Sequence, residues 1–263
     1  MSYHSRLCKA FQNAPTLPLT PSSRYVIISD CHRGDGDELW ENRNMEQIID
    51  IHSNVFWLLS RFYQENRLVM LYGNHDMEKK KSHYSTQKCA SYFCSDTQCQ
   101  QDLFPSLYFC ESLILKDQDK GHDLYLTHGH QADLFNSTLW ILTRFLVRYV
   151  WRPLEHFGVL DPTSAAKNCV RKDRTEKRLT TFARQNNIHL ITGHTHRPRL
   201  NAASPFYINS GSCVHPRCIT CLEIAQGELS LVKWSVNVKR DRTLFVERTV
   251  LSSCKISDLF LTG

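Results

Sequence analysis

The feature that most constrains the fold is a set of short apolar runs that each end in glycine and metal-capable polar residues. The clearest is Leu190–Thr192, which leads directly into Gly193-His194-Thr195-His196. An apolar run of this length predicts a buried strand. Active sites of open α/β sheets collect at the C-terminal ends of their strands. The sequence therefore predicts an α/β fold whose functional site is built from strand ends.

Three further apolar runs end in the same way. Their ends are Asp30-Cys31-His32 after Tyr25–Ser29, Gly73-Asn74-His75-Asp76 after Leu68–Tyr72, and His128-Gly129-His130 after Asp123–Thr127. Each end alone is also explained by a polar turn after a buried strand. Together they supply imidazole and oxygen ligands without cysteine, which suit Mn, Fe, Zn or Mg better than a thiolate site would.

Length and charge set broad limits on what the chain does. Its 263 residues suffice for one large domain or two small ones, and 41% hydrophobic with 22% charged residues is typical of a soluble globular protein. The net charge of +6 is mild for this size. It favours anionic substrates such as phosphate esters, and no specific nucleic-acid partner is expected.

The cysteines and the termini indicate a cytoplasmic protein. Eleven cysteines are an odd number, and no apolar segment typical of a signal peptide precedes them. Free thiols in a reducing compartment are therefore expected rather than a disulfide framework. Cys89, Cys94 and Cys99 are spaced by five residues, which is not a zinc-binding C-x-x-C pair, and their role stays open. No apolar stretch is long enough for a membrane span.

We expect one domain over residues 24–238, preceded by a proline-containing arm over 1–23 and followed by a weakly organised tail over 239–263. Apolar spacing predicts a helix over 45–65, whereas 79–103 is expected to be irregular. A second, charged helix is expected over 167–185. Alternating runs on either side of Gln226-Gly227 predict a closing hairpin.

Residues 134–160 are rich in aromatic and aliphatic side chains, and Arg144, Arg148 and Arg152 form a basic stripe at helical spacing. Such a helix could lie on a membrane or cover an apolar substrate. A core or dimer-interface helix with a basic edge is the favoured interpretation, because a soluble domain must bury such residues. Peripheral lipid contact through this segment is kept as an alternative, and the oligomeric state is open.

In this order, the motifs resemble those of the calcineurin-like metallophosphoesterases. The matching residues are Asp30 with His32, Gly34-Asp35, Gly73-Asn74-His75-Asp76, His128-Gly129 and Gly193-His194-Thr195-His196. The branch most similar in pattern is that of the bacterial UDP-2,3-diacylglucosamine pyrophosphohydrolases, with a G-H-T-H-R-P ending and a helical insertion after the fourth motif. The resemblance implies two facing mixed β-sheets flanked by helices, an α/β/β/α sandwich.

The resemblance also implies two divalent metal ions, with Mn as first choice and Fe, Zn or Mg as alternatives. The residues implied for the first ion are Asp30, His32 and His196, those for the second are Asn74, His128 and His194, and Asp35 would bridge the two. The implied reaction is hydrolysis of a phosphate monoester, diester or pyrophosphate by metal-activated water.

Four further residues take roles from the same resemblance. His75 would stabilise the transition state or protonate the leaving group, and Asp76 would orient His75. Arg33 and Arg197 would bind phosphate oxygens of the substrate.

One departure from the family pattern bears on activity. His32 and Asp35 are only three positions apart, so that one helix and one central strand of the family fold are expected to be missing. Either Asp35 or Asp37 could then supply the bridging carboxylate, and Asp35 is preferred because glycine precedes it and acids follow. The alternative function is a catalytically impaired metal-binding or interaction module derived from such an enzyme.

Overall fold

The computed structural model describes residues 2–31, 45–74, 77–94, 97–133, 169–215 and 217–261. The chain divides into two compact units, one formed by Met1–Cys31 with Ser112–Gly263 and the other by His32–Glu111. The expected segment 134–160 lies outside the described residues.

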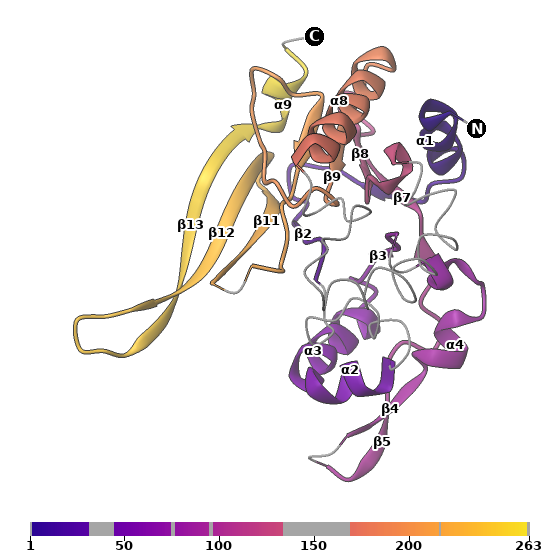
Figure 1. The fold of residues 1–263 in the computed structure, drawn as a ribbon, viewed down its shortest axis with the longest axis vertical. Coiled ribbons are helices and arrows are strands. Elements are labelled where there is room, and N and C mark those ends of the chain that lie inside the picture. The colour runs from indigo at the N-terminus through magenta and orange to yellow at the C-terminus, as the bar shows by residue number, and fades with distance from the viewer. Residues whose placement is uncertain are drawn as a thin grey trace, which may run out of the picture. The chain divides into compact units, whose positions relative to one another are not determined.

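A five-stranded mixed sheet forms the centre of the first unit (Figure 1). Its strands, in spatial order, are β1 (Thr16–Pro18), β7 (Ser112–Lys116), β8 (Leu124–Thr127), β9 (His189–Thr192) and β10 (Tyr207–Asn209). Only β7 and β8, which a short turn joins, are antiparallel neighbours. The parallel order of β8, β9 and β10 brings their C-terminal ends to the same edge of the sheet.

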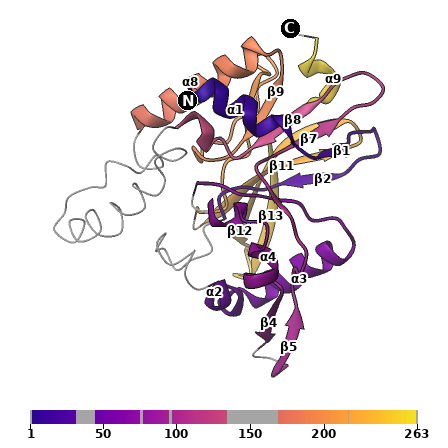
Figure 2. The ribbon, with the colours of Figure 1, turned by 90° about the vertical axis from the view of Figure 1, so that its right-hand side faces the viewer.

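Two helices cover one face of this sheet (Figure 2). They are α1 (Tyr3–Gln12) and α8 (Cys169–Gln185). Leu7 of α1 and Leu179 of α8 are fully buried, together with Leu190 and Tyr207 of the strands beneath them. The helix α8 corresponds to the charged helix that the sequence predicts. Its apolar stripe packs against β9, the strand that precedes the histidine pair.

The second sheet of this unit is antiparallel throughout its described pairs. Its strands, in spatial order, are β13 (Leu244–Lys255), β12 (Glu228–Val238), β11 (Cys218–Ala225) and β2 (Tyr25–Ile27). The predicted hairpin at Gln226-Gly227 is confirmed, and both turn residues have positive φ, 53° and 74°. Two-residue hairpin turns with this geometry match the twist of their strands. A short helix, α9 (Ile256–Leu259), follows β13.

Regular structure occurs in both segments that were expected as an arm and a tail. Residues 1–23 contain α1 and β1, and residues 239–263 contain β13 and α9. The strand β13 was not expected because its apolar side chains do not line a core. The apolar residues Leu244, Val246 and Val250 of β13 are exposed, so their alternation does not mark a buried face in the way that a core strand would.

The described part of the second unit contains three α-helices, a short 3-10 helix, two strand pairs and a core of its own. Its elements are α2 (Met45–Ile51), α3 (Ser53–Gln64), β3 (Met70–Leu71), η1 (Met77–Lys80), α4 (Tyr84–Lys88), β4 (Ser91–Cys94), β5 (Cys99–Asp102) and β6 (Phe109–Cys110). Strand β3 pairs in parallel with β6, and β4 pairs in antiparallel with β5. Phe56 and Phe104 are almost completely buried in this core.

Two expectations for this unit were wrong. The helix predicted over 45–65 is broken at His52, whose φ of −112° and ψ of 32° are not helical. The segment 79–103 is not irregular, because it contains a helix and a hairpin in which Cys94 lies opposite Cys99. The eleven cysteines, all of which lie in the described residues, form no disulfide.

The observed architecture is mixed α/β, with several sheets flanked by helices, as the sequence predicts. Among the described helices, none is both long and apolar enough to cross a membrane.

Candidate metal centre

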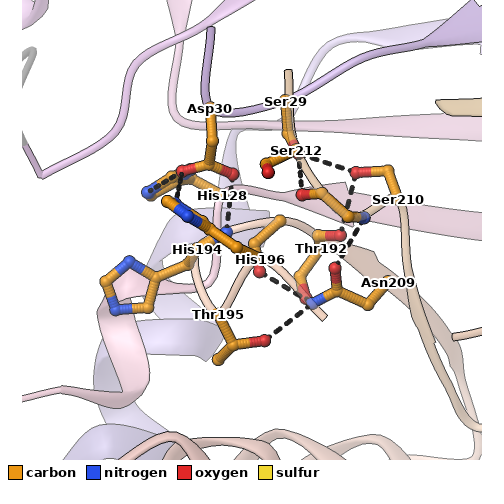
Figure 3. A network of polar contacts seen from close by, with 12 residues as sticks. Ser29, Asp30, His128, Thr192, His194, Thr195, His196, Asn209, Ser210 and Ser212 are labelled. Carbon is orange, nitrogen blue, oxygen red and sulfur yellow. Dashed lines mark hydrogen bonds and ion pairs between the residues drawn. The ribbon is translucent and has the colours of Figure 1, made fainter. Parts of the chain in front are cut away.

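Asp30 follows β2 and is the meeting point of three histidines in the first unit (Figure 3). Its Oδ1 lies 3.1 Å from His196 Nε2 and 3.9 Å from His128 Nε2. Its Oδ2 accepts a hydrogen bond of 2.9 Å from the backbone N–H of His194. The side chain of Asp30 is only 4% exposed. A buried carboxylate thus joins the ends of β2, β8 and β9.

The charge of Asp30 is stabilised by this surrounding. Burial alone raises the pKa of a carboxyl group, because water no longer solvates the anion. Here His128, His196 and His194 outweigh burial and hold the pKa of Asp30 well below its ordinary value. The group is therefore an anion over the whole physiological pH range, as a metal-binding carboxylate must be.

The loop after β9 adopts a conformation that few side chains tolerate. His194 and His196 have φ values of 62° and 57°, in the left-handed region. Such a backbone costs free energy for residues other than glycine and occurs mainly where function requires it. Gly193 begins the loop, and a Cβ there would lie 2.6 Å from Cβ of Ser29. Glycine at this position therefore lets the histidine loop approach the end of β2.

Asn209, at the end of β10, holds the histidine loop in place (Figure 3). Its Nδ2 donates to Gly193 O at 2.8 Å and to Thr195 Oγ1 at 3.1 Å. Its Oδ1 accepts from Gly211 N at 2.8 Å. Asn209 and Thr195 are both completely buried. On its other side, Thr195 Oγ1 donates to Glu176 Oε1 of α8 at 2.8 Å. The loop is thus fixed from a strand and from a helix.

His128 is delivered by β8, and its ring lies against that of His194 with centroids 5.0 Å apart. Gly129 follows with a φ of 105°, which turns the chain into the short helix η2 (His130–Ala132). Arg6 of α1 donates to the carbonyl of Gln131 at 2.8 Å. Arg178 of α8 donates to the carbonyl of Ala132 at 2.9 Å. The helical layer therefore fixes the segment that follows His128.

The sequence matches the calcineurin-like phosphoesterases over residues 22–198, which is more than half of the chain. The chain belongs to the calcineurin-like phosphoesterase family. No curated protein matches it significantly.

Two solved structures are similar to the chain at low identity. A single mutant of Vps29 from Entamoeba histolytica is 18% identical, with a TM-score of 0.27, and the match covers 55% of this chain and 62% of that one. Vacuolar Protein Sorting 29 from Cryptosporidium parvum is 16% identical, with a TM-score of 0.26, and the match covers 56% and 60%. The chain thus spans less than two thirds of the length of either structure.

Four of the residues that the family resemblance singled out are brought together, namely Asp30, His128, His194 and His196. Arg197 is placed differently, since it forms an ion pair with Asp173 of α8. Asn74 follows β3 and belongs to the second unit. The remaining predicted site residues, His32, Arg33, Asp35, His75 and Asp76, lie outside the described residues, as does Asp37.

The donor chemistry of this cluster fits the divalent ions that calcineurin-like phosphoesterases typically bind, because it combines an ionised carboxylate with imidazole nitrogens. Within the described parts of the chain, no three His, Cys, Asp or Glu side chains are placed to ligate one ion together. His194 contributes its backbone N–H to Asp30 in this arrangement. Two further ligands implied by the family, His32 and Asp35, belong to the undescribed segment.

Sequence reasoning missed Asn209 and Glu176 as supports of the site. Asn209 could have been found, because Tyr207–Asn209 is an apolar run that ends in a polar residue before Ser210-Gly211, like the runs that carry the ligands. Glu176 gives no comparable signal, since it is one of many charges along α8.

Proposed function

We propose that the protein is a dinuclear metal-dependent phosphoesterase that hydrolyses a phosphate monoester, diester or pyrophosphate. The observation that carries this proposal is the convergence of Asp30, His128 and His196, at 3.1 and 3.9 Å, within a chain of this family. When bound, two divalent ions would supply an activated water and neutralise charge on the phosphoryl group. Mn is the ion we expect, with Fe, Zn or Mg as alternatives.

Each ligand has a proposed place. Asp30, His32 and His196 would hold one ion, and Asn74, His128 and His194 the other. Asp35 would bridge them. Asp30 remains ionised, since the imidazoles hold its pKa low. It would therefore need no proton loss before metal binding.

The chemistry on the substrate falls to the other predicted residues. His75 would deliver a proton to the leaving oxygen, and Asp76 would keep the imidazole oriented. Arg33 and Arg197 would bind phosphate oxygens. Arg197 is paired with Asp173 on an exposed surface, so substrate would have to replace this carboxylate as its partner.

A narrower substrate, a lipid or nucleotide-sugar pyrophosphate, rests only on the pattern shared with the UDP-2,3-diacylglucosamine pyrophosphohydrolases. A cytoplasmic location is proposed because the cysteines form no disulfide. A catalytically impaired module remains the alternative, because His32 and Asp35 are so close in sequence.

The decisive experiment is a phosphoester panel, with an aryl phosphate, an aryl phosphodiester and a nucleotide-sugar pyrophosphate, assayed with and without Mn²⁺. We expect turnover that EDTA abolishes and that Asp30→Asn lowers by about 100-fold or more. The matched control, Asp119→Asn, removes a charge from an exposed turn and should retain full activity. Turnover unaffected by EDTA would exclude the proposal, and normal metal binding without turnover would favour the impaired module.

A further inference from the structure

Strands β12 and β13 continue beyond the rest of their sheet (Figure 1). The register of β11 ends where Cys218 pairs with Ser235. Val236–Val238 and Leu244–Val246 then pair with each other. Among the described residues, no third strand pairs with this extension. We call residues 236–246 the ribbon.

One face of the ribbon is apolar and exposed. Val236 lies directly opposite Val246, and Val238 lies opposite Leu244. Residues that alternate along a strand share a face, so these four side chains form one continuous patch. Their exposed fractions are 60%, 63%, 70% and 64% for Val236, Val238, Leu244 and Val246. An exposed apolar patch at a long sheet edge marks an interaction site or a site of aggregation.

The opposite face of the ribbon carries Asn237 and Phe245. Asn237 there donates a hydrogen bond to Glu247. Phe245 is half-buried, with Lys239 5.8 Å from its ring centroid. The ribbon's one aromatic ring therefore lies away from the apolar patch.

The tip of the ribbon is basic and has a defined turn. Lys239, Arg240 and Arg242 are exposed there, against one acid, Asp241. The side chain of Asp241 accepts hydrogen bonds from Thr243, at 3.0 Å from its N–H and 2.7 Å from its hydroxyl. The turn closes through Lys239 N to Thr243 O at 2.8 Å. The carboxylate of Asp241 thus stabilises the turn, while the three basic residues are exposed.

We propose that the ribbon docks on an anionic lipid bilayer. Aliphatic side chains beside basic residues are the combination that binds a membrane interface, because the former enter the acyl boundary while the latter contact anionic headgroups. Nucleic acid fits less well, since non-specific single-strand binding uses aromatic stacking and the exposed patch is purely aliphatic. The ribbon contains none of the residues proposed for the metal centre.

Vesicle co-sedimentation tests the proposal on the full chain. The probes are vesicles of phosphatidylcholine alone and vesicles with about 30% phosphatidylglycerol, at low and at physiological salt. We expect binding to the anionic vesicles only, weakened by salt. Arg240→Gln with Arg242→Gln should reduce the partition coefficient by roughly 25-fold, at about fivefold per charge.

Val238→Ser with Leu244→Ser should reduce partitioning by about tenfold or more. The matched control is Lys80→Gln with Lys81→Gln, which removes two exposed charges from the second unit and should partition like the unchanged chain. Circular dichroism confirms that each variant is folded, and the tip pair tests the proposal even if the apolar pair fails to fold.

Three results would overturn the proposal. The first is no binding to anionic vesicles, and the second is equal loss in the control pair. The third is occupation of the patch by another partner. A dimer in light scattering that Val238→Ser with Leu244→Ser abolishes would assign the patch to a second copy. Salt-sensitive binding of single-stranded RNA in place of vesicles would assign the tip to nucleic acid.

Discussion

At the scale of single residues, the histidine loop is supported by Asn209, which none of the motifs contains. It is completely buried and satisfies groups of Gly193, Thr195 and Gly211. Asn209→Ala should lower the free energy of unfolding by about 1–3 kcal/mol, because buried partners lose their hydrogen bonds. It should also weaken Mn²⁺ binding by roughly 10–100-fold, as loss of a ligand's support does.

Urea unfolding and Mn²⁺ titration calorimetry measure the two effects separately. Asn209→Asp should be no better than alanine, since an oxygen would then face the carbonyl of Gly193. The control is Asn201→Ala, at an exposed turn where the side chain accepts one backbone hydrogen bond. Unchanged Mn²⁺ affinity in a folded Asn209→Ala chain would show that the histidine loop keeps its conformation without Asn209.

Gly193 gives a second prediction at this scale. Gly193→Ala should cost about 2 kcal/mol or more and displace Asp30 from the histidines, because the new Cβ would overlap Ser29 and Asp30. Gly121→Ala is the matched control, with a φ of 68° and no atom within 4 Å of its Cβ. Its cost should be only the left-handed backbone penalty of about 1 kcal/mol. If thermal unfolding shows that Gly193→Ala and Gly121→Ala lower stability by the same amount, the close approach of Gly193 to Ser29 and Asp30 is contradicted.

At the scale of elements, His189 joins β9 to the end of α9. Its ring lies 4.0 Å from that of Phe260 and donates through Nδ1 to the carbonyl of Pro205. Burial lowers the pKa of His189 below its ordinary value. The unfolded chain therefore binds the proton more tightly, and stability that is present above about pH 6.5 is lost as pH falls through the folded pKa.

His189→Gln should reduce this acid sensitivity. The measurement is the difference in unfolding free energy between about pH 7.5 and pH 5.5, which lie on either side of the ordinary pKa of histidine. The exposed His215 supplies the control, and His215→Gln should leave the difference as it is in the unchanged chain. An unchanged difference in His189→Gln would mean that other groups cause the acid sensitivity.

The elements show where sequence reasoning succeeds. The strands β2, β3, β8 and β9 were predicted, because their apolar runs end in distinctive polar residues. β13 was not, since its apolar side chains point to solvent and its alternation gave no sign of burial. The break at His52 also escaped prediction, because apolar spacing continues across it.

At the scale of the whole molecule, the sequence predicts the members of the metal centre but not its supports. Asp30 and His194 are 164 positions apart and yet hydrogen-bonded, and strand ends explain their meeting. The hydrogen bonds that Thr195 forms with Asn209 and Glu176 depend on how α8 and β10 pack around the histidine loop. That packing is a tertiary property which no local pattern encodes.

Metal content is the most direct test of the central claim, that Asp30 and its histidines belong to a dinuclear centre. The purified chain is loaded with Mn²⁺, passed over a desalting column and analysed by mass spectrometry, beside Asp30→Asn and Asp119→Asn. We expect about two ions per chain in the unchanged protein and in Asp119→Asn, and about one or none in Asp30→Asn. One ion or none in the unchanged chain, or two in Asp30→Asn, would contradict it.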